Sequence, residues 1–134
     1  MKHDQLFYLV NVLGSDSYTD CHIKGSINVP LDTLETWAKT VELHTQIVVY
    51  CASYSCNVSF KAYKILEGLG FANVQAYEGG TSEWKQLGYP IVGKCLQSYI
   101  QEVHQPEQRI GVRSINADEV KKLLKYYGYL QENN

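Results

Sequence analysis

Short apolar runs along the chain alternate with segments in which apolar residues recur at helical spacing. Four runs are rich in Val, Ile, Leu and aromatic residues and end at turn-forming or polar positions, at 6–13, 26–30, 46–50 and 73–77. Runs of this length and composition are typical of buried strands. Between the last two, apolar residues from Val58 to Leu69 repeat on one helical face, and Gly70 follows as a C-terminal stop. The alternation predicts an α/β fold with a central parallel sheet and helices on both of its faces.

Two shorter helices are predicted on either side of this central unit. Asp32 followed by Glu35 matches a variant of the capping box, so we expect a helix from 33 to about 39. A second short helix is expected over 82–87, after the turn formed by residues 78–80.

The last third of the sequence has a different pattern. A helical pattern runs over 94–104 and is broken at 105–108, and residues 116–119 then open a capped helix that runs to about Tyr127. We therefore expect one domain over 1–92 and a C-terminal helical extension over 93–134.

Length and charge limit the classes of function. A chain of 134 residues can bury a core without disulfides or metal ions. Its net charge is −2 and its Lys and Arg residues are dispersed, so neither a nucleic-acid footprint nor a basic membrane patch is indicated. The N-terminal residues lack the apolar stretch of a secretory signal, and no run is long enough to span a bilayer. We expect a cytoplasmic protein whose four cysteines stay reduced or serve redox chemistry.

Cys51 is the strongest candidate for chemistry. It follows the apolar run 46–50 and precedes a helix that begins near Asn57, so its thiol is expected at a strand-to-helix turn. Backbone amides of the loop 51–56 and the positive end of the helix would favour the thiolate, which is the nucleophilic form. The alternative is a buried structural cysteine.

Four separated blocks resemble those of the rhodanese family. They are Leu9–Leu13, the segment Cys21–Pro30, the loop Cys51–Cys56, and a final block of Tyr77–Gly80 with Trp84 and Gly88–Pro90. Their order and spacing match those of a single rhodanese domain over about 6–92. The resemblance implies a three-layer α/β fold with a central parallel sheet, to which the C-terminal helical extension is added.

This resemblance also implies an activity. Cys51 would accept a sulfane sulfur as a persulfide and pass it to a thiol, cyanide or a protein acceptor, without a cofactor. Backbone amides from 52 to 58 would stabilise the charge on the terminal sulfur. The expected substrate-binding loop consists of Ala52, Ser53, Tyr54, Ser55, Asn57 and Val58.

The loop departs from the family pattern in its charge. Related phosphatases carry a loop one residue longer that ends in Arg, whereas Asn57 is the sixth residue after Cys51, so phosphatase activity is not expected. Many members that use thiosulfate have Arg or Lys within the loop, which is absent here. Thiosulfate activity should therefore be weak, which favours a persulfide, a small thiol or a partner protein as the sulfur source.

Cys56 leaves two interpretations open. As a resolving thiol it could attack a persulfide or sulfenic acid on Cys51, release sulfide or water and form a Cys51–Cys56 disulfide that gates the loop by redox state. Such a thiol is compatible with a sulfurtransferase, and also with a non-catalytic binding or redox-sensing module that uses the disulfide as a switch. Alternatively, Cys56 packs at the start of the helix. Cys51 and Cys56 with Cys21 and His22 lack the short ligand pairs of structural zinc sites, so no metal site is expected.

The segment 114–124 resembles the capped helix that usually precedes the first strand of a rhodanese domain. Since the chain begins almost at that strand, the C-terminal helix could replace the missing one, within one chain or by exchange in a homodimer. An unrelated terminal helix is the alternative.

Overall fold

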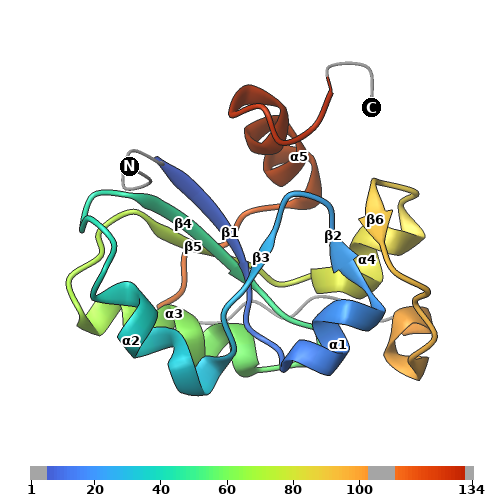
Figure 1. Cartoon of the computed structure of the whole chain (residues 1–134), viewed down its shortest axis with the longest axis horizontal. Helices are drawn as coiled ribbons and strands as arrows, with labels where there is room; N and C mark the ends of the chain where they lie inside the picture. The colour runs from blue at the N-terminus through green and yellow to red at the C-terminus, as the bar shows by residue number, and fades with distance from the viewer. Residues whose placement is uncertain (1–5, 103–110, 132–134) are drawn as a thin grey trace.

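The computed structural model describes residues 6–102 and 111–131, and its centre is a four-stranded parallel sheet, which Figure 1 shows in place. The strand order is β3-β1-β4-β5. The strands are β1 (Phe7–Asn11), β3 (Ile27–Asn28), β4 (Gln46–Tyr50) and β5 (Val74–Tyr77), and every neighbouring pair is parallel. The predicted sheet is confirmed.

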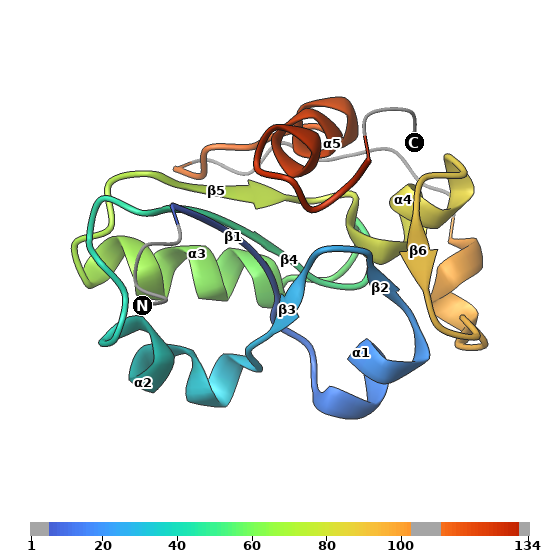
Figure 2. The same ribbon diagram turned by 45° about the horizontal axis from the view of Figure 1, so that its top comes forward.

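Helices cover both faces of this sheet, as Figure 2 shows. On one face lie α2 (Leu34–Ala38) and α3 (Val58–Gly68), and on the other lies α5 (Ala117–Tyr126). Successive residues of β1 point to opposite faces, so Val10 packs with the first pair of helices and Leu9 packs with α5. Burial on both sides explains why the strands are continuously apolar.

The C-terminal helix α5 packs on the sheet of its own chain. Its N-terminus has a capping box in which Asn116 and Glu119 bond to each other's backbone amides. Val120 and Leu124 are both fully buried in the cluster that contains Phe7. Burial of such aliphatic side chains contributes roughly 1.5–3 kcal/mol each, so α5 adds to the stability of the fold. Exchange of this helix between two copies stays a prediction.

Smaller elements surround one end of the sheet. A helix α1 (Ser15–Asp20), which the sequence pattern did not reveal, leads into β2 (His22–Ile23). The strand β2 pairs antiparallel with β6 (Ile91–Val92), and α4 (Gly80–Gln86) lies between β5 and β6 in the sequence.

Two predictions about helices are wrong. Within the described part of 94–104, the chain forms only a short 3₁₀ turn, η3 (Ser98–Gln101), because Gly93 and Cys95 take positive φ values of 114° and 57°. The break predicted at 105–108 lies outside the described residues. The helix predicted over 33–39 is present as α2, but its capping box at Asp32 does not form: a 3₁₀ turn, η2 (Leu31–Thr33), precedes α2, whose N-cap is Thr33, without a side-chain bond.

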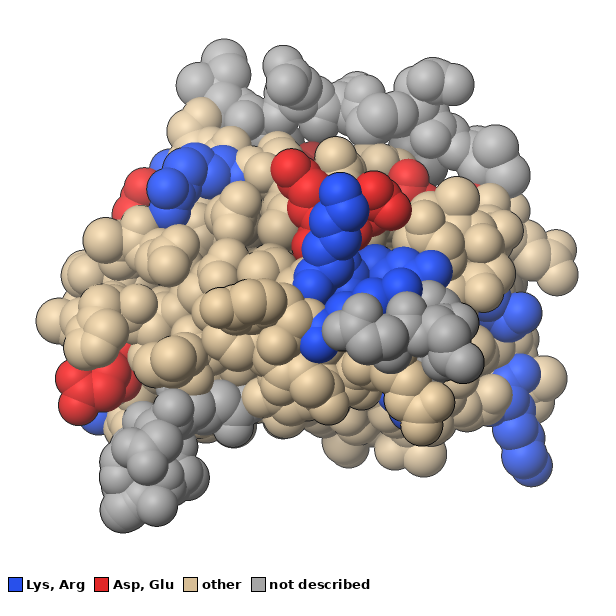
Figure 3. All heavy atoms as spheres, turned by 90° about the horizontal axis from the view of Figure 1, so that it is seen from above, with Lys and Arg blue, Asp and Glu red and all other residues tan. Residues whose placement is uncertain are grey.

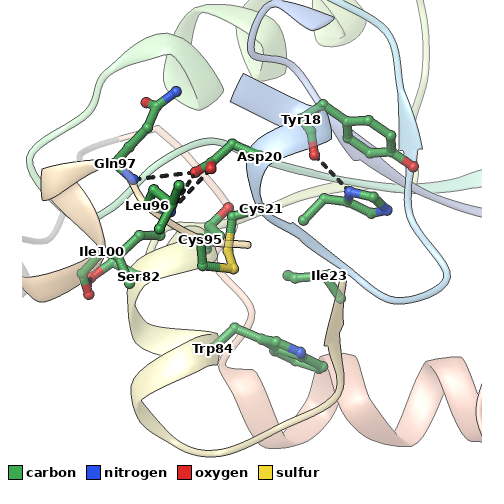
Figure 4. Close-up of a disulfide and its surroundings, with 12 residues drawn as sticks. Tyr18, Asp20, Cys21, Ile23, Ser82, Trp84, Cys95, Leu96, Gln97 and Ile100 are labelled. Carbon is green, nitrogen blue, oxygen red and sulfur yellow. Dashed lines mark hydrogen bonds between the residues drawn. A yellow bond between two sulfur atoms is a disulfide. The ribbon is translucent and has the colours of Figure 1, made fainter. Parts of the chain in front are cut away.

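A disulfide joins Cys21 to Cys95, so the expectation that the four cysteines stay reduced is wrong for this pair, while the alternative of redox chemistry stays a prediction (Figure 4). The physical reason is the pairing of β2 with β6. His22 lies opposite Val92 in that pairing, which places Cys21 beside the segment that follows β6. The bond thereby ties the beginning of the extension to the domain, across 74 positions of sequence.

The surface shows no large region of one charge on the face that Figure 3 presents, where basic and acidic side chains lie next to one another. On α5, Lys122 and Asp118 form an exposed ion pair at 3.7 Å. Among the described residues, no helix combines the length and the apolar composition that crossing a membrane requires.

Candidate functional site

Cys51 lies at the carboxyl end of β4, where the sequence predicted it, and the loop after it leads into α3. The first turn of α4 holds this position. Thr81 donates to the Cys51 carbonyl from its amide, over 3.1 Å, and from its hydroxyl, over 3.3 Å. The Ser82 amide donates to the Ala52 carbonyl over 2.9 Å. The loop backbone is therefore fixed by a second element that follows β5.

Gly80 makes this contact between α4 and the loop sterically feasible. It has a φ of 65°, and a Cβ atom added there would lie 2.5 Å from the Cys51 carbonyl oxygen and 2.8 Å from the carbonyl carbon of Ala52. Both contacts are to backbone atoms, which cannot move aside as a flexible side chain can. A glycine is thus required for the close approach of the two segments.

The Cys51 thiol is buried and does not have the lowered pKa that the sequence suggested. Cys51 is 1% exposed, and the Ser59 amide donates a hydrogen bond to Cys51 Sγ over 3.4 Å. A hydrogen bond with the Cys56 thiol, together with burial, raises the pKa of Cys51 well above its ordinary value. Hydrogen bonds from Ser59 act in the opposite direction but are outweighed. The expectation of easy ionisation is therefore corrected, because desolvation and a neighbouring thiol oppose the helix terminus.

The hydroxyl groups of the loop contact acidic side chains. Ser53 and Ser55 both donate to Glu102 Oε1, over 2.6 and 2.8 Å. Tyr54 donates to Glu83 Oε2 over 3.2 Å. Burial and the charge of Glu83 raise the pKa of Tyr54 to about 12, so its phenol stays protonated and acts as a donor.

A pocket of about 140 Å³ opens beside the loop, against the first turns of α4. Its lining residues are Ser53, Tyr54, Gly79, Ser82, Glu83, Gln86 and Glu102. Two of these carry carboxylates, and no Lys or Arg stands among the described lining residues. Cys51 itself is not part of this lining, whereas its loop neighbours Ser53 and Tyr54 are.

The structure brings Cys51 and Cys56 together at one point, as the sequence suggested, and neither takes part in a disulfide. Of the remaining loop residues, Asn57 is the exposed N-cap of α3, and Val58 packs against the core. Residues that sequence reasoning missed are Ser59, Thr81 and Glu102. Ser59 lies one position beyond the predicted loop, whereas nothing in the sequence connects Glu102 with Cys51.

His22 and Cys21 do not form a metal site with the loop thiols. Cys21 is bonded to Cys95, and the Nδ1 atom of His22 lies 2.6 Å from the Tyr18 carbonyl oxygen. The His22 ring also stacks on Tyr18, with 3.7 Å between the ring centroids. Over 6–102 and 111–131, no group of three or more His, Cys, Asp or Glu side chains has an arrangement suited to a metal ion.

Comparison with known proteins identifies the same family across most of the domain. The family model of the rhodanese-like domain matches residues 1–87. The adenylyltransferase and sulfurtransferase uba4 of Ogataea parapolymorpha is 30% identical over 79 residues, which are 59% of this chain and 20% of that protein. The thiosulfate:glutathione sulfurtransferase of Saccharomyces cerevisiae is 31% identical over 101 residues, covering 65% of this chain and 70% of that protein.

A third relative is an HTH-type transcriptional regulator of Mycobacterium tuberculosis, 30% identical over 83 residues, which are 62% of this chain and 36% of that protein. The chain thus spans about a fifth of the first of these relatives and about a third of the regulator.

Solved structures agree with this comparison. The rhodanese-like domain of the Alr3790 protein from Anabaena sp. has a TM-score of 0.59 at 30% identity, and the alignment covers 63% of this chain and 85% of that one. A rhodanese from E. coli, solved with anions, has a TM-score of 0.53 at 27% identity, covering 65% of this chain and 98% of that one.

Proposed function

The chain belongs to the rhodanese-like domain family, and we propose that it is a sulfurtransferase that carries a sulfane sulfur as a persulfide on Cys51. The observation that supports this proposal most is the position of Cys51. It follows β4 within the family match, and the first turns of α3 and α4 both contact it, through Ser59 and Thr81. Of these contacts, the one from the Ser59 amide reaches the sulfur itself, where it would stabilise a negative charge.

The transfer has two steps. The Cys51 thiolate attacks the outer sulfur of a persulfide R–S–SH, so that a new S–S bond forms on Cys51 and the thiolate RS⁻ leaves with the electron pair of the broken bond. An acceptor thiolate or cyanide then attacks the outer sulfur of the Cys51 persulfide and restores the Cys51 thiolate. A protein thiol serves as acceptor in the same way.

The Ser59 amide is the group that best fits stabilisation of the sulfur charge. It already donates to Cys51 Sγ and belongs to the first turn of α3, where backbone amides have no helical partner. The predicted binding groups for the outer sulfur are the loop amides, which belong to Ala52, Ser53, Tyr54, Ser55, Asn57 and Val58. Removal of a preorganised donor of this kind typically costs about 10²–10³ in rate.

Persulfide donors fit this site better than thiosulfate does. Thiosulfate has two negative charges, and the described lining of the pocket contributes Glu83 and Glu102 but no cation. Two like charges about 4 Å apart repel by roughly 4 kcal/mol at the effective dielectric of a protein surface. We therefore expect thiosulfate to be a poor donor.

The cytoplasmic location stays a prediction, and the Cys21–Cys95 bond bears on it, because disulfides persist mainly in oxidising compartments.

Steady-state transfer tests this proposal. Purified protein is given the persulfide of 2-mercaptoethanol and cyanide, and thiocyanate is measured over time for the wild type, Cys51→Ser and Cys56→Ser. Thiocyanate formation above the uncatalysed rate that Cys51→Ser abolishes and Cys56→Ser retains supports the proposal. Equal rates for the wild type and Cys51→Ser would contradict it.

A second candidate function is a thiol-disulfide sensor, and the hydrogen bond between Cys51 and Cys56 favours it specifically. With hydrogen peroxide as the oxidant, the Cys51 thiolate becomes a sulfenic acid and releases hydroxide. Cys56 then attacks the sulfenic sulfur, water leaves, and a Cys51–Cys56 disulfide forms. The partner of such a module would be a protein that distinguishes the two loop states.

Peptide mapping after mild peroxide treatment tests this candidate. A tryptic peptide 40–61 that contains both cysteines and has lost two hydrogens in the wild type, replaced by a sulfenic or sulfinic acid on Cys51 in Cys56→Ala, supports the sensor. Overoxidation of Cys51 that is equally fast in both proteins would rule out a resolving role for Cys56.

A further inference from the structure

The segment 93–102, called the strap below, runs from β6 back to the loop that holds Cys51. One of its attachments is to α4. Ser82 Oγ donates to the carbonyl oxygens of Ile100 and Glu102, both over 3.3 Å. Gln86 Nε2 donates to the same two carbonyls, over 2.9 and 2.7 Å. Two side chains of α4 thus hold the end of the strap in place.

Another attachment is to the end of α1, as Figure 4 shows. Cys95 is bonded to Cys21, and its amide donates to the Asp20 carbonyl over 2.8 Å. The carboxylate of Asp20 accepts from the amides of Leu96, over 3.0 Å, and Gln97, over 3.3 Å. The strap is therefore fixed at both ends by contacts that leave the substrate-binding loop itself uninvolved.

The fixed strap delivers the Glu102 carboxylate to the loop. Its Oε1 atom accepts from the hydroxyls of Ser53 and Ser55, and Ser53 is only 3% exposed. A sulfonate oxygen of thiosulfate would accept hydrogen bonds from the same two hydroxyls that the Glu102 carboxylate oxygen accepts from. The Ser53 and Ser55 hydroxyls are thus already occupied by a group of the protein itself.

We propose that Glu102 is a specificity-determining residue that excludes donors with an oxyanion at the reacting end and admits the persulfides of uncharged small thiols. The –S–SH group of a persulfide has no oxygen atoms, so the reacting end of such a donor does not need the Ser53 and Ser55 hydroxyls. Thiosulfate must displace the Glu102 carboxylate and then lie beside it and beside Glu83, which also lines the pocket. This inference rests on the proposed function and names the class of donor for it.

Sulfur loading of Cys51 by two donors tests the inference. The wild type, Glu102→Ala, Glu102→Gln and the control Asp118→Asn, whose side chain is 66% exposed on α5, are each mixed with thiosulfate or with 2-mercaptoethanol persulfide. Intact mass against time gives the loading rates. Loading from thiosulfate should rise about tenfold in Glu102→Ala, because the carboxylate that competes with thiosulfate for the Ser53 and Ser55 hydroxyls through charge-assisted hydrogen bonds is removed. The rise should be smaller in Glu102→Gln. Loading from the persulfide should change by less than about threefold, and Asp118→Asn should match the wild type.

A binding measurement separates this inference from the proposed function. Thiosulfate is titrated calorimetrically into Cys51→Ser and into Cys51→Ser with Glu102→Ala, neither of which can be loaded. Affinity that rises about tenfold with the second substitution supports the role of Glu102, and unchanged affinity overturns it. Absence of loading by either donor in the wild type would overturn the proposed function alone, since the titration still decides the role of Glu102.

Discussion

Removal of the Cys21–Cys95 disulfide should destabilise the protein by several kcal/mol. The bond spans 74 positions of sequence. Three of the four strands of the parallel sheet, β3, β4 and β5, lie between its two cysteines, and β1 precedes them. In the chain-entropy model, a closed loop of this size removes roughly 15 cal/mol/K from the unfolded chain, or about 4 kcal/mol at 25 °C. The pairing of β2 with β6 and the bonds of Asp20 remain in the reduced protein, so we expect the same fold with a smaller free energy of unfolding.

Urea unfolding measures this change. The oxidised wild type, the reduced wild type and a Cys21→Ser, Cys95→Ser variant are followed by the fluorescence of Trp37 and Trp84. With a urea slope of about 2 kcal/mol/M, a loss of 4 kcal/mol lowers the midpoint by roughly 2 M. Cys56→Ser is the matched control, because its thiol takes no part in a disulfide and its midpoint should respond to reductant as the wild type's does. A difference below about 1 kcal/mol between oxidised and reduced wild type would refute the reasoning.

Three further predictions concern the loop and α5. Gly80→Ala should lower the free energy of unfolding by about 1–3 kcal/mol, because its Cβ would meet the loop backbone at a positive φ, while Gly14→Ala, with open space around it, should be nearly neutral. Similar urea midpoints for the two variants would contradict this steric argument. Leu124→Ala should cost about 2–5 kcal/mol in unfolding experiments, since the side chain is fully buried against the sheet, and a cost below 1 kcal/mol would mean that α5 is not part of the core. Cys56→Ala should lower the raised pKa of Cys51, so that the rate of alkylation by iodoacetamide begins to rise at a lower pH than in the wild type. An unshifted pH profile would exclude Cys56 as the main cause of the raised pKa.

The elements that the sequence predicted well are those determined by local patterns. The strand 46–50 appears with the predicted bounds, because an uninterrupted apolar run between polar positions is decisive by itself. The helix α3 follows from its apolar spacing, and α5 from its capping box, both of which involve residues within a few positions of one another. The position of Cys51 at the end of β4 follows from the same local evidence.

Features that depend on distant contacts could not be predicted. The strap was expected to be helical from its apolar spacing, but the bonds that Asp20 and Cys21 make with it determine its path. The role of Glu102 depends on this path, so no local pattern around it indicates a contact with Ser53. The pKa of Cys51 was predicted from the loop amides and the helix terminus, whereas Cys56 and burial reverse its direction.

The central claim is that Cys51 carries a transferable sulfur, and intact mass spectrometry tests it most directly. Reduced protein is exposed briefly to 2-mercaptoethanol persulfide, desalted and weighed, with Cys51→Ser treated in parallel. A gain of the mass of one sulfur atom that the variant lacks, and that a thiol removes, is the predicted result. An unchanged mass of the wild type, or an equal gain in Cys51→Ser, would contradict the claim.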